Sequence, residues 1–193
     1  LGNLDLIGME ILPLLINTKL PILHHIGFIE PSFGPTEITT SNNYMMIAAS
    51  QAVKESLIHK GFKSANYPIV YPGARVNLFG GEITKRELPI SPDGSEQKPL
   101  CICFAGLLMS SKGLHTLIDA IIKLKEKNIH TRTMIAGESF QNGYKEQLEI
   151  ILKKNNAHHS VYFTGSLSRE QLARFFRLSH VFVFPSIYPE AFG

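Results

Sequence analysis

The chain has 193 residues, of which 44% are hydrophobic and 18% are charged, and its formal net charge is +3. These fractions are typical of a folded globular protein and exclude a disordered chain, which would be less apolar and more charged. The Lys and Arg residues are scattered along the chain, so the sequence gives no support for nucleic-acid binding.

The first 80 residues predict a strand, helix, strand order. Short apolar runs bounded by Pro, Asn, Ser or Gly predict buried strands at 20–26, 44–49 and 69–71. Between the last two runs, Ser50 can cap a helix that Gly61 ends. Val53, Leu57 and Ile58 fall on one face of that helix.

Three features bear on the cellular compartment. The apolar stretches at 4–15 and 100–109 are shorter or more interrupted than the roughly 20 apolar residues of a membrane span. Cys101 and Cys103 lie two apart in an apolar, strand-like segment, so their side chains point the same way and are poorly placed to bridge. The chain opens without a signal-like start, and both ends are expected to be cut. We therefore expect reduced cysteines, no transmembrane helix and a cytoplasmic protein.

The composition shifts to Gly, Pro, Ser, Asp, Glu and Lys over residues 81–99, which predicts a linker between a first domain at 1–80 and a second at 100–193. After it, the expected order is strand 100–105, helix 114–127, strand 132–136, helix 143–155, strand 161–164, helix 169–178 and strand 181–184. Ser168 and Gln171 form a capping box for the third helix. This alternation predicts an α/β protein whose parallel sheet is covered on both faces.

Ligands of such sheets bind at the carboxyl ends of the strands, so the loops there matter most. The loop at 105–113 ends in Lys112 and Gly113 at the start of a helix, a combination of a cation with unpaired N–H groups that favours a phosphate. The plainer alternative is a tight turn at Gly106 and a solvated lysine. The loop has neither the Walker spacing nor the dinucleotide fingerprint, so the usual markers of ATP hydrolysis and NAD chemistry are missing.

The last segment carries the most specific pattern. An apolar strand ends in Pro185-Ser186, and a turn then delivers Glu190 followed by Phe192-Gly193. Together with the segment at 106–113, Gly137 and Gly165, this order and spacing resembles the retaining family-4 (group 1) glycosyltransferases. The resemblance implies the GT-B fold, with two Rossmann-like parallel-sheet domains, each partial here. Residues 1–80 would be the acceptor-side domain, and 100–193 the nucleotide-sugar-binding domain.

The resemblance also implies roles for individual residues. The donor and its phosphates would contact Gly106, Lys112, Gly113, Ser186, Phe192 and Gly193. Lys112 would hold the donor diphosphate, and Leu107 stands where the family has a partner arginine. Glu190 would accept hydrogen bonds from hydroxyls of the donor sugar, which suits an ionised carboxylate. A second glutamate of the family signature would lie beyond residue 193.

The implied reaction moves a sugar from a nucleotide-sugar, such as a UDP- or GDP-sugar, to a hydroxyl of a sugar, lipid or other acceptor, with retention at the anomeric carbon. It needs no cofactor, no metal and no protein nucleophile, because the protein positions the substrates and stabilises the leaving diphosphate. Peripheral membrane association and a homo-oligomer remain open. The sugar, nucleotide and acceptor are not predicted, since specificity lies in variable loops.

The sequence also contains two pairs of adjacent histidines and a set of aromatic residues in the second half. Adjacent residues on a strand face opposite ways, so the pairs His24-His25 and His158-His159 are not expected to bind one metal ion. His25, at the end of a first-domain strand, is a candidate catalytic residue that would touch a sugar; the alternative is a structural histidine. A mostly buried position is expected for Tyr162, Phe163, Phe175, Phe176, Phe182 and Phe184.

Two alternative functions remain open. A non-catalytic or degenerate nucleotide-sugar-binding module would fit the missing arginine at Leu107, but Lys112 and Glu190 oppose it. A nucleotide-sugar epimerase would share the two-domain architecture, but the run from Pro185 to Gly193 fits the transferases better.

Overall fold

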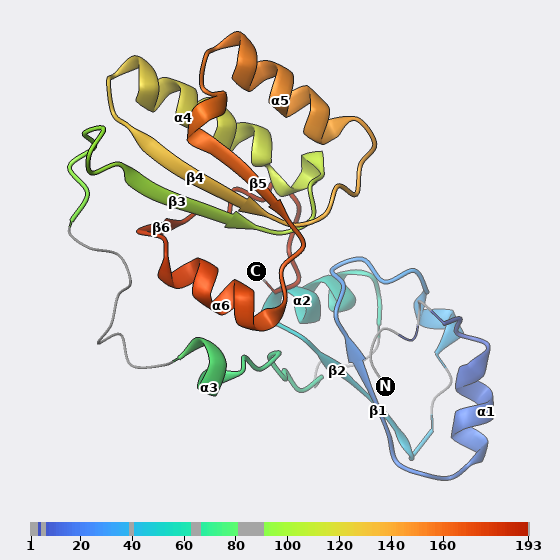
Figure 1. Cartoon of the computed structure of the whole chain (residues 1–193). Helices are drawn as coiled ribbons and strands as arrows, with labels where there is room; N and C mark the ends of the chain where they lie inside the picture. The colour runs from blue at the N-terminus through green and yellow to red at the C-terminus, as the bar shows by residue number, and fades with distance from the viewer. Residues whose placement is uncertain (1–3, 5–6, 39–40, 63–66, 81–90, 193) are drawn as a thin grey trace. The chain divides into compact units, whose positions relative to one another are not determined.

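The computed structural model describes residues 4, 7–38, 41–62, 67–80 and 91–192 (Figure 1). These residues form two compact units, and each is described by itself. The first comprises Leu1–Ala74 with Pro189–Gly193, and the second comprises Arg75–Tyr188. Most of the expected linker, residues 81–90, lies outside the described residues.

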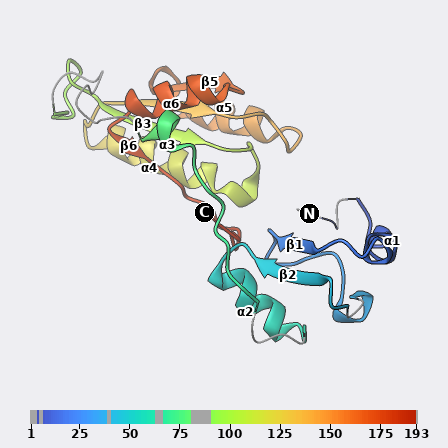
Figure 2. The ribbon, with the colours of Figure 1, turned by 90° about the horizontal axis from the view of Figure 1, so that it is seen from below.

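The first unit is a small α/β layer. It contains α1 (Ile11–Asn17), β1 (Ile22–Ile26), the 3₁₀ turn η2 (Pro35–Glu37), β2 (Tyr44–Ala48) and α2 (Gln51–His59). Strands β1 and β2 are parallel and lie side by side in both views (Figures 1 and 2). The expected third strand is only an isolated parallel bridge between Ala48 and Ile69. The sequence did not predict α1.

The predicted cap of α2 is confirmed. Ser50 has an extended backbone, and its side-chain oxygen accepts a hydrogen bond from the Val53 N–H at 3.2 Å. Val53 and Leu57 are buried in the core of the unit, but Ile58 is 47% exposed. The prediction that Ile58 shares one face with Val53 and Leu57 was therefore wrong, because the buried stripe of this short helix is only wide enough for residues at i and i+4.

The second unit is a four-stranded parallel sheet with helices on both faces. Its elements are α3 (Val76–Phe79), β3 (Leu100–Ala105), η3 (Ser110–Lys112), α4 (Leu114–Glu126), β4 (Thr131–Ala136), α5 (Tyr144–Lys154), η4 (His158–Ser160), β5 (Val161–Gly165), α6 (Arg169–Arg177) and β6 (Val181–Phe182). The strand order is β5-β4-β3-β6. Helices α4 and α5 cover one face and α6 covers the other (Figure 1). The α/β class and the covered parallel sheet are thus confirmed.

The two faces of the sheet hold separate apolar clusters. The larger one packs Ile102, Phe104 and Ile135 against buried residues of α4 and α5. The smaller one packs Cys103 and Ala136 against Phe175 of α6. The capping box of α6 is confirmed, since the Ser168 side chain accepts from the Gln171 N–H and the Gln171 side chain accepts from the Ser168 N–H.

The last strand is shorter than the strand predicted at 181–184. Strand β6 has only two residues, although the Val183 N–H still donates to the Cys103 carbonyl at 2.9 Å. Half of the aromatic residues expected in the core are exposed: Tyr162 by 50%, Phe182 by 48% and Phe184 by 44%. The reason for the last two is that Phe182 lies in the edge strand β6 and Phe184 just after it, where no further strand of the described residues covers them.

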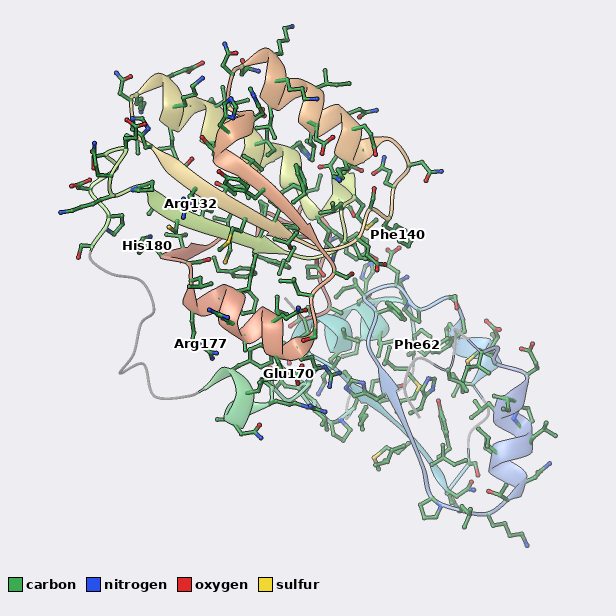
Figure 3. The ribbon with its side chains drawn as sticks, in the orientation of Figure 1. Phe62, Arg132, Phe140, Glu170, Arg177 and His180 are labelled. Carbon is green, nitrogen blue, oxygen red and sulfur yellow. The ribbon has the colours of Figure 1, made fainter. Side chains whose placement is uncertain are left out.

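At the amino end of the sheet, His180 fastens β6 to β3. Its N–H donates to the Cys101 carbonyl at 2.8 Å, and its Nδ1 accepts from the Cys101 N–H at 2.9 Å. Figure 3 shows His180 at the opposite end of the sheet from Phe140.

Both cysteines are free, Cys103 being buried and Cys101 partly so. No helix among the described residues is long and apolar enough to cross a membrane.

Candidate functional site

Glycines mark the carboxyl ends of three neighbouring strands in the second unit. The Gly106 N–H donates to the Ala136 carbonyl at 3.0 Å, and the Gly137 N–H donates to the Gly165 carbonyl at 2.9 Å. Gly137 has φ +141°, and a Cβ on it would lie 1.8 Å from the Gly106 carbonyl oxygen. Only glycine fits there, so the strand ends pack backbone against backbone.

The loop after β3 is held against the segment after β6. Gly113 has φ +68°, and a Cβ on it would lie 1.9 Å from the Pro185 carbonyl oxygen. The Ser111 carbonyl accepts from the N–H groups of Ile187 at 2.9 Å and Tyr188 at 3.2 Å. It also accepts from the Ser186 hydroxyl at 3.3 Å. We call these three hydrogen bonds the Ser111 junction.

Lys112 lies at the mouth of helix α4, as the sequence predicted. Its ammonium nitrogen is 5.9 Å from the ring centroid of Tyr188, within the range of a cation–π contact. In the first turn of α4, the Thr116 N–H bonds to the Gly113 carbonyl and the His115 N–H bonds to the Tyr144 hydroxyl. Within the described residues, the Leu114 N–H has no acceptor. A lysine and a helix N-terminus with an unused N–H together favour an anion.

The loop after β4 braces the loop after β3. The Leu108 N–H donates to the Glu138 carbonyl at 2.8 Å, and the Leu108 carbonyl accepts from the N–H groups of Phe140 and Gln141. The Gln141 side-chain oxygen accepts from the Ser110 N–H at 2.9 Å. Phe140 itself is 66% exposed beyond the carboxyl ends of the strands (Figure 3).

Tyr144 adds a contact that the sequence did not predict. Its hydroxyl lies 3.1 Å from the His115 backbone nitrogen and 3.1 Å from His115 Nδ1. Burial raises the pKa of this hydroxyl, so it keeps its proton at neutral pH. The residues are 29 positions apart, and no local pattern relates them.

The first unit contains the other candidates. His25 is half-buried, and its Nε2 donates to the Val70 carbonyl at 3.0 Å. His24 is fully buried on the opposite side of β1, with Nδ1 2.8 Å from the Tyr44 hydroxyl, so the two neighbours face opposite ways as predicted. Burial raises the pKa of Tyr44 well above its ordinary value, which keeps that hydroxyl protonated.

The structure thus divides the predicted site residues between the units. Gly106, Lys112, Gly113 and Ser186 lie together at the carboxyl edge of the second sheet. Glu190 and Phe192 belong to the first unit with His25, and the Phe192 ring lies 5.8 Å from the Tyr71 ring. Gly193 lies outside the described residues.

The histidine pair at 158–159 departs from its prediction. The two residues lie on the 3₁₀ turn η4, where successive side chains do not alternate, and their ring centroids are 3.8 Å apart. The expectation that they face opposite ways was wrong, because it assumed a strand. Among the described side chains, no three His, Cys, Asp or Glu residues are grouped as metal ligands would be.

Comparisons with known proteins agree on one architecture. The family model described as "Glycosyl transferases group 1" matches residues 86–193. HepE from Anabaena, solved with UDP and glucose, has a TM-score of 0.67 at 19% identity over 91% of this chain and 49% of its own. A glycosyltransferase from Rickettsia africae has a TM-score of 0.69 at 15% identity over 96% of this chain and 56% of its own.

A third solved structure, sucrose-phosphate synthase from Thermosynechococcus elongatus, has a TM-score of 0.67 at 17% identity and covers 94% of this chain and 48% of its own. These likenesses show the fold, which is of the GT-B type. The chain spans about half the length of these proteins. No curated protein sequence matches it.

Proposed function

This chain belongs to the glycosyl transferases group 1, and we propose that it takes part in transferring a sugar from a nucleotide-sugar donor to an acceptor hydroxyl. The observation that carries the proposal is a grouping of three features at the carboxyl edge of the second sheet. There Lys112, the start of α4 and the Ser111 junction come together. A donor diphosphate is the part of a nucleotide-sugar that such a site would hold.

The chemistry of the site suits the departure of a diphosphate. As the bond to the anomeric carbon breaks, negative charge grows on the leaving phosphate oxygen. A fixed ammonium and a backbone N–H stabilise that charge without rearranging, and they do so more strongly in the transition state than in the ground state. Lys112 and the Leu114 N–H are the groups that we assign to this task.

We further propose that the reaction retains the anomeric configuration and that the chain belongs to the family-4 enzymes. In this scheme Glu190 accepts hydrogen bonds from hydroxyls of the donor sugar, and His25 contacts a sugar from the first unit. Gly106, Gly113, Ser186, Phe192 and Gly193 line the donor site. Residues 1–80 serve the acceptor side and 100–193 serve the nucleotide-sugar, with 81–99 between them. The acceptor is a hydroxyl of a sugar, lipid or other compound.

The test is a donor screen with the intact protein. UDP-, GDP- and ADP-sugars are supplied one at a time with a mixture of hydroxyl acceptors, and release of the nucleoside diphosphate is measured together with the configuration of the product by NMR. We expect release from one nucleotide class and an α-linked product from an α-linked donor. An inverted product would contradict retention, and no release or binding with any donor would contradict the function.

The role of Glu190 has its own test. In the proposed scheme it recognises the sugar and forms no covalent bond, so Glu190→Gln should slow transfer about tenfold or more through loss of a charge-assisted hydrogen bond. Mass spectrometry of wild-type protein quenched during turnover of a slow donor analogue should show no sugar on Glu190. An adduct would make Glu190 a nucleophile.

A second candidate function is a binding module without turnover. The observation that favours it is Leu107, which is 43% exposed next to the anion site and brings no positive charge to it. Tight binding of a nucleoside diphosphate without release from any donor in the same screen would support this function instead.

A further inference from the structure

The contact between Tyr144 and the first turn of α4 has a defined hydrogen-bond direction. A backbone N–H can only donate, so the Tyr144 oxygen accepts from the His115 N–H at 3.1 Å. The hydroxyl can then donate its proton to the other partner at the same distance, His115 Nδ1, in the arrangement in which Nδ1 accepts. A neutral imidazole that accepts at Nδ1 carries its own proton on Nε2.

The position of this contact connects it to the anion site. His115 is the second residue of α4 and follows Lys112 by three positions. The Tyr144 hydroxyl occupies the His115 N–H, whereas the neighbouring Leu114 N–H has no acceptor among the described residues. Tyr144 therefore decides which N–H groups of the turn remain available to an anion.

Tyr144 is also well fixed. It is 6% exposed, and its ring packs in the cluster between the sheet, α4 and α5. Its backbone N–H donates to the Gln141 carbonyl, and the Gln141 side chain accepts from the Ser110 N–H. Gln141, in the loop before α5, thus holds the loop after β3 at Ser110, and Tyr144, the first residue of α5, holds α4 at His115.

We propose that the Tyr144 hydroxyl is a positioning group for the donor-phosphate site: it anchors the first turn of α4 and fixes His115 in the tautomer protonated on Nε2. This inference rests on the proposed function, because the anion that the turn would hold is the donor diphosphate. Tyr144 acts through the α4 turn and not by touching the reacting atoms.

The test removes the hydroxyl and keeps the ring. In the intact protein, Tyr144→Phe should weaken binding of UDP, GDP or ADP, whichever the wild type binds, by about fivefold through loss of one anchoring hydrogen bond. The donor KM should rise while the acceptor KM stays unchanged. The control is Tyr162→Phe, the same change at a half-exposed residue of β5, which should leave affinity unchanged.

Two variants of His115 separate positioning from general damage. His115→Asn places an oxygen close to the position of Nδ1 and keeps an acceptor for the hydroxyl, so it should bind the nucleotide nearly as the wild type does. His115→Leu removes the side-chain acceptor but keeps the backbone N–H that bonds to Tyr144, so it should weaken binding less than Tyr144→Phe does. Nitrogen-15 NMR of the imidazoles should show one tautomer for wild-type His115 and a mixture in Tyr144→Phe.

Wild-type affinity in Tyr144→Phe, or a mixed His115 tautomer in the wild type, would overturn the inference. A different result would contradict the proposed function. In that case the wild type would bind none of the three nucleotides, and the NMR measurement would still decide whether Tyr144 fixes His115.

Discussion

The two units hold their candidate residues in different ways. At the carboxyl edge of the second sheet, main chain packs on main chain: Gly113 lies against the Pro185 carbonyl and Gly137 against the Gly106 carbonyl. In the first unit, His25 is fixed by one side-chain hydrogen bond to the Val70 carbonyl. The geometry of the proposed phosphate site is therefore set by contacts between backbone atoms, whereas the position of the His25 ring is set by a single side-chain hydrogen bond.

The largest effect should come from adding one methyl group at Gly113. Gly113→Ala combines a positive φ with a Cβ 1.9 Å from the Pro185 oxygen, so we expect a loss of about 2 to 5 kcal/mol of unfolding free energy. Gly143→Ala is the matched control, because its φ of +75° is similar and nothing lies within 4 Å of the added atom. The control should lose only about 1 to 2 kcal/mol.

Denaturant unfolding of the intact protein measures both glycine variants. Equal losses in the two would show that strain at positive φ accounts for the whole effect. In that case the close contact with the Pro185 carbonyl would add nothing to the loss of unfolding free energy, and the second unit would not be distinguished by its backbone packing.

A smaller effect is expected for ligand binding at Lys112. Lys112→Ala should weaken the affinity for the nucleoside diphosphate by about 1.5 to 3 kcal/mol, because a hydrogen bond to a charged group is lost. Lys123→Ala, at an exposed position near the far end of the same helix, is the control. Calorimetric titration measures both, and an affinity unchanged by Lys112→Ala would remove this lysine from the donor site.

The smallest effect should be at His25. His25→Ala removes one hydrogen bond to the Val70 carbonyl, so the expected loss of unfolding free energy is about 0.5 to 1.5 kcal/mol. Thermal unfolding measures this loss. If it equalled that of Gly113→Ala, the contrast between a backbone-built and a side-chain-built region would fail.

The regular elements of the second unit were predictable because periodicity is a local signal. Strand 100–105 and the start of α4 at Leu114 match the prediction, and the capping box of Ser168 and Gln171 is formed. The positions of exposed apolar residues were less predictable. Whether Phe182 is covered depends on which strand lies at the edge of the sheet, and a single sequence does not give the strand order.

The candidate site was predictable only in part. A lysine and a glycine before a helix suggested an anion site, and both lie where expected. The contacts that hold them join Gly113 to Pro185 and His115 to Tyr144, segments that approach only in the folded chain. The roles given to Glu190 and His25 stay predictions.

The Ser111 junction also has a consequence for the order in which the protein is made. Its two sides are 75 residues apart, so the ribosome completes the loop at Ser111 well before it adds Ser186. At a synthesis rate of roughly 5 to 20 residues per second, the interval is on the order of 4 to 15 seconds. During that time β3 and β4 can pair, but the loop lacks the segment that locks it. The proposed phosphate site can therefore mature only after Ser186 has been added.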